Sequence, residues 1–297
     1  MREKQERRTG RIDKSKSGAS PRQDSPKGKG RRPLRNDGPK RIYTPKSEAE
    51  MSSEEVSHPD TIRLNRYIAN SGVCSRREAD TLIVKGLVTV NGKVATELGL
   101  QVKLTDDIRY NGKKLNPEQK VYVLINKPKD MVTTTSDPEG RRTVMDLIAD
   151  ACEERLYPVG RLDRNTTGVL LLTNDGDLSK KLTHPSSETK KIYHVFLDRP
   201  IAKQHLTDIR KGIELEDGLI KPDLVNYADA NDHSQIGIEI HSGRNRIVRR
   251  IFESLGYKVE KLDRVYFAGL TKKNLARGKW RFLTKDEVMF LKAGILK

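Results

Sequence analysis

Asp163 is the residue of this 297-residue chain whose type and setting could most directly do chemistry. It lies in a Gly-Arg-Leu-Asp-Arg-Asn-Thr-Thr-Gly segment that begins at Gly160 and leads into four aliphatic residues, 169–172. A short apolar run bounded by turn residues predicts a buried strand, so we expect Asp163 in a loop on a rigid scaffold. Arg161 would project to the same side of an extended chain and keep the carboxylate ionised, as a nucleophile requires.

The same pattern has an ordinary interpretation, a surface Arg–Asp pair beside a turn. A second segment helps to decide between a catalytic aspartate and a surface pair. Residues 190–197 form a predicted strand with apolar residues on both faces, which indicates central burial. Its Tyr193 follows Lys190 and Lys191, and a basic entry beside an aromatic is typical of single-stranded nucleic-acid binding. Tyr193 is therefore either a core aromatic or a platform on which a base stacks.

A third segment, residues 242–256, predicts an amphipathic helix rich in arginine. One face is apolar and carries Ile247, Val248, Ile251, Phe252 and Leu255. Arg246, Arg249 and Arg250 share the opposite face, where like charges three and four residues apart repel each other. We interpret such an unpaired cluster as a site for a bound anion, with a solvated basic face as the alternative.

Composition points to the same class of partner. The net charge is +17 and the isoelectric point is near 9.8, which favours nucleic acid, because lysine and arginine neutralise phosphates. A membrane surface is the second candidate, but the sequence has no run of 18 apolar residues and no apolar signal-peptide core. Two cysteines, Cys74 and Cys152, and six histidines without ligand spacing predict a reduced, metal-free, cytoplasmic protein.

The chain divides by composition into a tail and two domains. Residues 1–58 are basic, almost without aliphatic side chains, and are expected to be disordered. This tail either holds a nucleic-acid backbone loosely or is a dispensable solubilising segment. We place a small domain at residues 61–118 and a larger one at residues 120–297.

The small domain begins with two short helices. The first carries Leu64, Tyr67 and Ile68 and ends near Gly72, and the second starts with a capping box of Ser75 and Glu78 and ends at Gly86. Two hairpins follow, each centred on Asn-Gly, at 91–92 and 111–112.

This pattern, and above all R-L-N-R-Y-I-A-N-S-G-V-C-S-R-R-E-A-D, resembles the αL-type RNA-binding module of ribosomal protein S4 over about residues 61–104. The resemblance implies that the arginines of the two helices contact phosphates without reading sequence. They are Arg63, Arg66, Arg76 and Arg77. Taken singly, each arginine favours the interpretation as a solvated surface charge, whereas the cluster favours phosphate contacts.

The larger domain is predicted to be richer in strands. We expect a buried strand at 121–125, a short helix near 142–148, and a helix over 178–182. Asp175 and Asp177 lie in an Asn-Asp-Gly-Asp turn just beyond the strand that follows Asp163, and we interpret them as turn formers.

Three motifs, G-R-L-D-R-N-T-T-G, K-K-I-Y-H-V and G-R-N-R-I-V-R-R, follow the S4-like module in this order. In that combination the chain resembles the RsuA/RluB family of bacterial ribosomal RNA pseudouridine synthases over about residues 61–288, and T-N-D-G-D-L and T-H-P-S resemble its large-subunit branch. The family implies Asp163 as the catalytic aspartate and Arg249 as its partner. It also implies that the substrate contacts are Arg161, Tyr193, Arg246 and Ile247. One departure is Asp130, where relatives commonly have glycine, so that loop is expected to turn differently.

The resemblance also implies an α+β fold: an S4-like domain followed by a mixed, mostly antiparallel sheet with flanking helices. The reaction would isomerise a uridine of ribosomal RNA, in the 23S rRNA or else the 16S rRNA, free or in a pre-ribosomal particle. A metal or other cofactor is not needed, and a monomer is expected. A non-catalytic ribosome assembly factor is the second hypothesis. A glycosidase would ordinarily use two carboxylates, and a metal-dependent hydrolase is the remaining alternative.

Overall fold

A computed structural model describes residues 60–294. The chain divides into two units, Met1–Val56 and Ser57–Lys297, and the described residues belong to the second. The predicted tail at 1–58 lies outside the described residues. Within residues 60–294, no helix is both long enough and apolar enough to span a bilayer.

The small domain has the two helices that its apolar spacing and its one capping box predict. α1 (Leu64–Asn70) follows β1 (Thr61–Arg63), and α2 (Arg76–Val84) begins at a capping box. The Ser75 hydroxyl accepts a hydrogen bond from the Glu78 N–H, and the Glu78 carboxylate accepts one from the Ser75 N–H. Both helices pack on one core, whose fully buried members include Leu64, Ile68, Ala79, Ile83 and Ile108.

The two Asn-Gly turns also form as predicted. One joins β2 (Val88–Val90) to β3 (Lys93–Val94), and the other joins β5 (Ile108–Tyr110) to β6 (Lys113–Lys114), in a sheet of order β3-β2-β5-β6. Asn91 and Asn111 have φ of 49° and 48°, the left-handed conformation that a type I′ turn requires. β4 (Gln101–Lys103) pairs separately with β1.

The larger domain is built on one mixed sheet, which confirms the predicted α+β fold. Its strand order is β11 (Leu224–Tyr227), β12 (Gln235–Ile240), β10 (Lys191–Leu197), β13 (Val259–Phe267), β9 (Thr166–Thr173), β7 (Tyr122–Lys127) and β15 (Trp280–Phe282). β14 (Leu270–Thr271) pairs with β13, and β8 (Tyr157–Pro158) pairs with β9. Among these described strands β13 and β9 run parallel, and the other neighbours are antiparallel.

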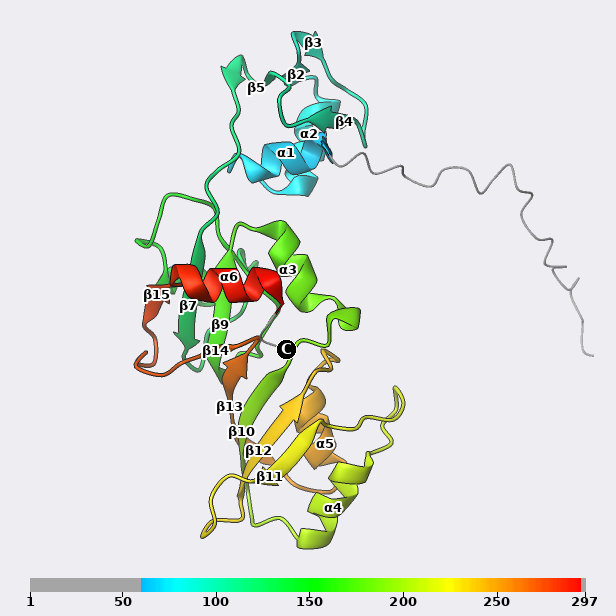
Figure 1. Ribbon diagram of the computed structural model, residues 1–297, viewed down its shortest axis with the longest axis vertical. Coiled ribbons are helices and arrows are strands. Elements are labelled where there is room, and N and C mark those ends of the chain that lie inside the picture. The colour runs from blue at the N-terminus through cyan, green and yellow to red at the C-terminus, as the bar shows by residue number, and fades with distance from the viewer. Residues whose placement is uncertain (1–59, 295–297) are drawn as a thin grey trace, which may run out of the picture. The chain divides into compact units, whose positions relative to one another are not determined.

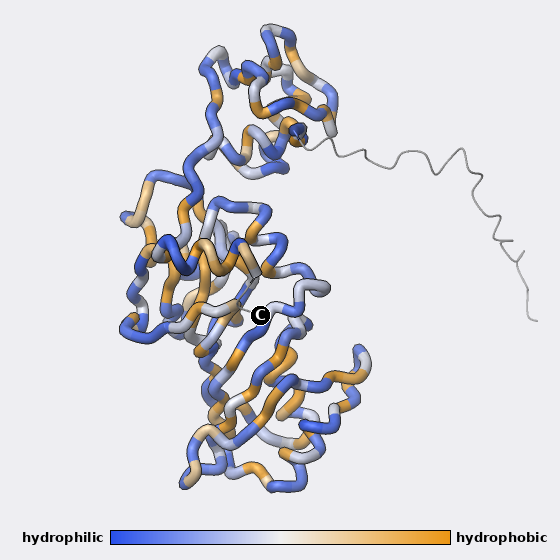
Figure 2. Tube along the Cα trace, viewed as in Figure 1, coloured by the Kyte–Doolittle hydropathy of each residue, from blue (hydrophilic) through white to orange (hydrophobic). Residues whose placement is uncertain are grey.

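β7 and β9 form the best-covered part of the sheet, because both of their faces are packed. On one face lie α3 (Gly176–Thr183) and α6 (Lys285–Ala293), and Figure 1 shows α6 crossing these strands. The other face packs against the chain between 131 and 162, which includes the 3-10 helix η2 (Val144–Leu147). Every residue of both strands is buried, and the Cα trace of Figure 2 is coloured mostly as hydrophobic in this part of the domain.

β10 to β12 are covered on one face by α4 (Lys203–Lys211) and α5 (Ile247–Glu253). The prediction that β10 is buried on both faces is therefore wrong in part. β10 is central in the strand order, but most of its residues, among them His194 and Phe196, stay half-exposed. The reason is that α4 and α5 cover only the face that carries Val195 and Leu197.

The two halves of the sheet meet where β9 and β13 pair in parallel. Gly168 is the partner of Arg264 in this register. A Cβ atom on Gly168 would lie 2.7 Å from the Arg264 nitrogen and closer still to its carbonyl oxygen, and the φ of Gly168 is +110°. Only glycine allows the two backbones to come this close.

Candidate active site

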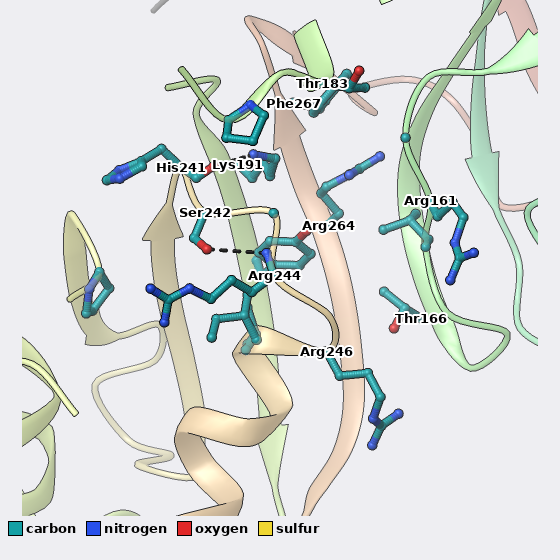
Figure 3. A pocket seen from close by; sticks show the side chains of 18 of the residues that line it. Arg161, Thr166, Thr183, Lys191, His241, Ser242, Arg244, Arg246, Arg264 and Phe267 are labelled. Atoms are coloured by element: carbon teal, nitrogen blue, oxygen red, sulfur yellow. Dashed lines mark hydrogen bonds between the residues drawn. The ribbon is translucent and has the colours of Figure 1, made fainter. Parts of the chain in front are cut away.

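A cavity of about 1140 Å³ opens at this junction, with Asp163, Tyr193 and Arg264 among its lining residues. In Figure 3, Arg161 and Thr166 lie on one side of the pocket and His241 and Arg244 on the other. The strand that carries Arg264 runs between the two sides. Both halves of the sheet therefore contribute to one pocket, as expected for a site formed where strand directions change.

Asp163 lies in the loop just before β9 and faces two guanidinium groups. Its Oδ2 atom is 3.6 Å from Nη1 of Arg246 and 3.8 Å from Nε of Arg249. The Asp163 side chain is 36% exposed, and the Arg249 side chain is 9% exposed. The carboxylate is therefore open to the pocket, while the cation behind it is enclosed.

α5 holds these two arginines differently. Arg246 caps the helix in the left-handed conformation, with φ of 47°. Arg249 is anchored from behind, because its Nη1 donates to the Val259 carbonyl at 2.8 Å. Burial lowers the pKa of Arg249 and the charge of Arg246 acts in the same direction, whereas Asp163 raises it. Asp163, and to a smaller extent Glu253, therefore compensates the buried charge of Arg249.

The prediction of an unpaired arginine face on this helix is wrong. Arg250 forms a bidentate ion pair with Asp217, at 2.6 and 2.9 Å. Arg249 turns toward Asp163 instead of solvent, and Arg246 also lies 3.4 Å from Glu253. Asp217 and Asp163 come from chain segments far away in sequence, so a helical projection of residues 246–255 does not reveal these two partners.

Arg161 lies on the exposed rim of the pocket. The ion-pair partners of Asp163 among residues 60–294 are Arg246 and Arg249, so the guanidinium nearest the carboxylate is not the sequence neighbour. Ile247 is buried and lines the pocket. Tyr193 is half-buried, packs against the cores of both sheet halves and also lines the pocket. It therefore has features of a core aromatic and of a platform on which a base could stack.

Lys127, which sequence reasoning missed, supports the loop that carries Asp163. Its side chain is fully buried at the end of β7, and Nζ donates to the carbonyls of Pro128, Arg164 and Thr166 at 2.8 to 3.1 Å. Burial lowers the pKa of Lys127 to about 8, and Asp163 acts in the opposite direction. A polar residue directly after a run of buried apolar residues was the available signal.

Asp130 stabilises the same loop from the other side. It adopts φ of 63°, the left-handed conformation for which glycine is the usual residue and which aspartate tolerates. Its N–H donates to the Arg164 carbonyl at 3.0 Å, and its carboxylate lies 3.3 Å from the Arg164 side chain. The turn therefore accommodates aspartate in a conformation that suits glycine.

Two further cations lie in the pocket wall, Lys191 on β10, which the sequence marks as part of a basic entry, and Arg264 on β13, which sequence reasoning missed. Arg264 is 3% exposed and donates from Nε to the Val169 carbonyl at 2.8 Å. Burial lowers its pKa, while the Tyr193 hydroxyl acts in the opposite direction. The available signal was its position two residues after Leu262, an inward-facing position of the strand that an apolar residue would normally occupy.

The predicted RNA contacts of the small domain lie at the helix starts. Arg76 and Arg77 are exposed in the first turn of α2, and Arg63 is exposed at the end of β1. Arg66 forms an ion pair with Asp177 of the larger domain. Asp175 is structural, because it caps α3 at the Leu178 N–H and accepts a hydrogen bond from the Tyr122 hydroxyl.

Among residues 60–294, no three histidine, cysteine or acidic side chains come together as metal ligands would.

Two protein-family models match the chain. A model described as RNA pseudouridylate synthase matches residues 121–254, and the S4 domain model matches residues 62–108.

Individual relatives agree with these models. The chain is 43% identical over 234 residues to the ribosomal large subunit pseudouridine synthase B of Bacillus subtilis, covering 78% of this chain and 96% of the relative. It is 37% identical over 237 residues to the dual-specificity RNA pseudouridine synthase RluF of Escherichia coli, covering 78% and 79%. A solved pseudouridylate synthase structure aligns with a TM-score of 0.57 and 29% identity, over 77% of this chain and 99% of that one.

Proposed function

The chain belongs to the RsuA/RluB-type family of RNA pseudouridine synthases that carry an S4 domain, and on this premise we propose that it isomerises a uridine of ribosomal RNA with Asp163 as the catalytic group. The observation that carries the proposal is the geometry of Asp163. Its carboxylate is open to the pocket, and two guanidinium groups lie 3.6 and 3.8 Å from it. An ionised carboxylate held in this way is suited to nucleophilic attack or to proton abstraction.

The reaction needs one such group. The bond between N1 of the base and C1′ of the ribose breaks, the base turns, and C5 bonds to C1′. N1 ends with a proton and C5 has lost one, so there is no net oxidation and no water is consumed. Asp163 starts this sequence by attacking the nucleotide or by removing a proton from the sugar. Neither route requires a cofactor.

The target nucleotide must leave the RNA stack to reach Asp163, an extrusion that costs a few kcal/mol. Tyr193 in the pocket wall would support the extruded base, and stacking of a base on an aromatic ring contributes about 1–3 kcal/mol. Arg161 on the rim and Arg246 beside Asp163 would contact the flanking backbone, with Ile247 against the ribose or base.

The S4 domain would hold the RNA outside the pocket. Arg76 and Arg77 lie in the first turn of α2, where positive side chains are unfavourable with respect to the helix dipole. A bound phosphate would relieve this and use the free backbone N–H groups of the turn. Arg63 and Arg66 complete the proposed phosphate contacts, and residues 61–118 and 120–297 are the two functional domains.

We favour the 23S RNA of the large subunit as substrate because of the name of the Bacillus subtilis relative. The dual specificity in the name of the Escherichia coli relative supports a second candidate, action on a further RNA such as 16S rRNA. The protein would work as a cytoplasmic monomer on free or partly assembled ribosomal RNA.

Pseudouridine mapping of both ribosomal RNAs, with and without the gene, tests this proposal. We expect one or a few pseudouridines to disappear from the 23S rRNA on deletion and to return with the wild-type gene. Unchanged modification of both RNAs, accompanied by defective ribosome assembly, would instead identify a non-catalytic assembly factor.

A further inference from the structure

Arg264 is a buried cation without a carboxylate partner among residues 60–294. It is 3% exposed, its guanidinium lies 4.5 Å from the centre of the Phe267 ring, and Nε donates to the Val169 carbonyl. Its Nη2 atom is buried and has no hydrogen-bond partner. A buried charge is normally paired, because transfer from water costs several kcal/mol. The pocket wall therefore contains a buried cation whose neighbour, the Tyr193 hydroxyl, is a neutral group and does not balance its charge.

Lys191 adds a second cation to the same wall. Its Nζ donates to the carbonyls of Thr189 and His241, at 2.9 and 2.6 Å, and Asp223 raises its pKa. Burial lowers the pKa of Lys191 to about 8, and the charge of Arg264 acts in the same direction. Two cations that line one pocket are suited to an anionic ligand.

Tyr193 indicates which part of the substrate these cations would meet. It is the cross-strand partner of Arg264 in the β10–β13 register, and its hydroxyl raises the pKa of Arg264. A base that lies against the Tyr193 ring would therefore have its edge near Arg264. Asp163 lies in the loop before β9, in the other wall of the pocket, where the ribose would have to be.

The base becomes an anion during the reaction. When the C1′–N1 bond breaks, the electron pair stays with uracil and spreads over N1, O2 and O4, until C5 bonds to C1′ and releases its proton. Fixed donors stabilise charge that develops in the transition state more than they stabilise the neutral substrate. A buried guanidinium near the base edge would act in this way.

We propose that Arg264, assisted by Lys191, binds the detached uracil through a carbonyl oxygen and stabilises its negative charge. This inference rests on the proposed function and assigns a further substrate-contacting residue to it. The structural alternative is that Arg264 only ties β13 to β9 through the Val169 carbonyl.

The test compares 23S and 16S rRNA transcripts made with uridine or with 5-fluorouridine, at enzyme excess. Fluorine withdraws electrons and stabilises the uracil anion, so a variant that lacks the stabilising cation should be partly rescued. We expect Arg264→Gln to slow pseudouridine formation by about 100-fold or more, with RNA affinity unchanged. On the fluorinated RNA, C5 has no proton to release, so after the C5–C1′ bond forms water adds at C6 and the product is a carbon-linked fluorinated hydrate. For Arg264→Gln, appearance of this product should be slower than for the wild type by less than about 10-fold.

Two further variants separate charge from architecture. Arg264→Lys keeps the charge and should recover part of the rate. Arg210→Gln is the matched control, because the Arg210 Nε donates to the Val225 carbonyl at 3.0 Å in the same manner but outside the pocket. Its rates should equal those of the wild type on both RNAs.

The inference would be overturned if Arg264→Gln slowed product formation equally on the uridine and the 5-fluorouridine RNA. It would also be overturned if weaker RNA binding accounted for the whole loss of rate. If Arg264→Gln does not fold, the same comparison with Lys191→Met decides, with a smaller loss on uridine RNA and the same rescue expected. A wild-type protein that forms no pseudouridine would refute the proposed function instead.

Discussion

Asp163 and Arg264 lie in the walls of one pocket but are held in opposite ways. Asp163 is 36% exposed, lies in a loop, and has two arginines near its carboxylate. Arg264 is 3% exposed, lies in a strand, and has no carboxylate partner in the described part of the chain. The first wall has a carboxylate whose charge is already balanced, and the second has a cation that no carboxylate of the described chain balances. In the proposed reaction, the group that starts it and the group that stabilises the detached base thus lie on different walls.

The largest loss of stability and activity should come from a substitution at the junction of the two walls, where β9 pairs with β13. Gly168→Ala places a methyl group against the Arg264 backbone at a φ of +110°. Both the overlap and the backbone strain are destabilising, and we expect a loss of more than about 3 kcal/mol in unfolding free energy, together with loss of activity. Urea denaturation measures the first and pseudouridine formation the second. A stable, active variant would show that the two backbones need not approach so closely.

The next effect concerns the balance of charge at Asp163. Arg249→Gln removes the enclosed guanidinium 3.8 Å from the carboxylate, and we expect pseudouridine formation to slow by about 100-fold. Arg250→Gln, one residue away, breaks only the surface pair with Asp217, so stability and activity should both stay close to those of the wild type. Equal losses in both variants would contradict the different roles of these neighbours. Single-turnover rates and thermal denaturation distinguish them.

A smaller effect should come from Lys127, which holds the Asp163 loop. Because burial lowers its pKa from 10.5 to about 8, the folded protein has released a proton between these values that the unfolded chain still binds. The free energy of unfolding of the wild type should therefore rise with pH across this window. Lys127→Met should lack this pH-dependent contribution to the free energy of unfolding. It should also form pseudouridine about 10-fold more slowly, because the loop that carries Asp163 loses three hydrogen bonds.

Urea titrations on both sides of the window measure the pH effect. Lys191 titrates in the same range and remains in both proteins, so the comparison is between the slopes of the wild type and the variant. Identical slopes would show that Lys127 does not change its charge there.

The small domain was predictable from sequence because its signals are local. The Ser75 and Glu78 capping box lies within four residues, and each Asn-Gly turn determines its own hairpin. These elements follow from residue type and short spacing. The tertiary arrangement adds the core but does not change them.

The pocket was predictable only in part because its contacts are long-range. The motifs identify Asp163 and Arg249, but the parallel pairing of β9 with β13 brings Arg264 against Gly168, nearly a hundred residues away in sequence. The partner of Arg250 likewise comes from a distant loop. A helical projection contains no information about partners outside the helix. Charged residues at inward positions of predicted strands are the signal that would have pointed to Arg264.

The most direct test of the central assignment is pseudouridine formation by Asp163→Asn on 23S rRNA transcripts. Asparagine keeps the size of the side chain and removes its charge, so RNA affinity should stay near that of the wild type while product falls below detection. Arg210→Gln, outside the pocket, should match the wild type in both measurements. Pseudouridine formed by Asp163→Asn at a rate near that of the wild type would contradict the assignment of Asp163 as the catalytic group.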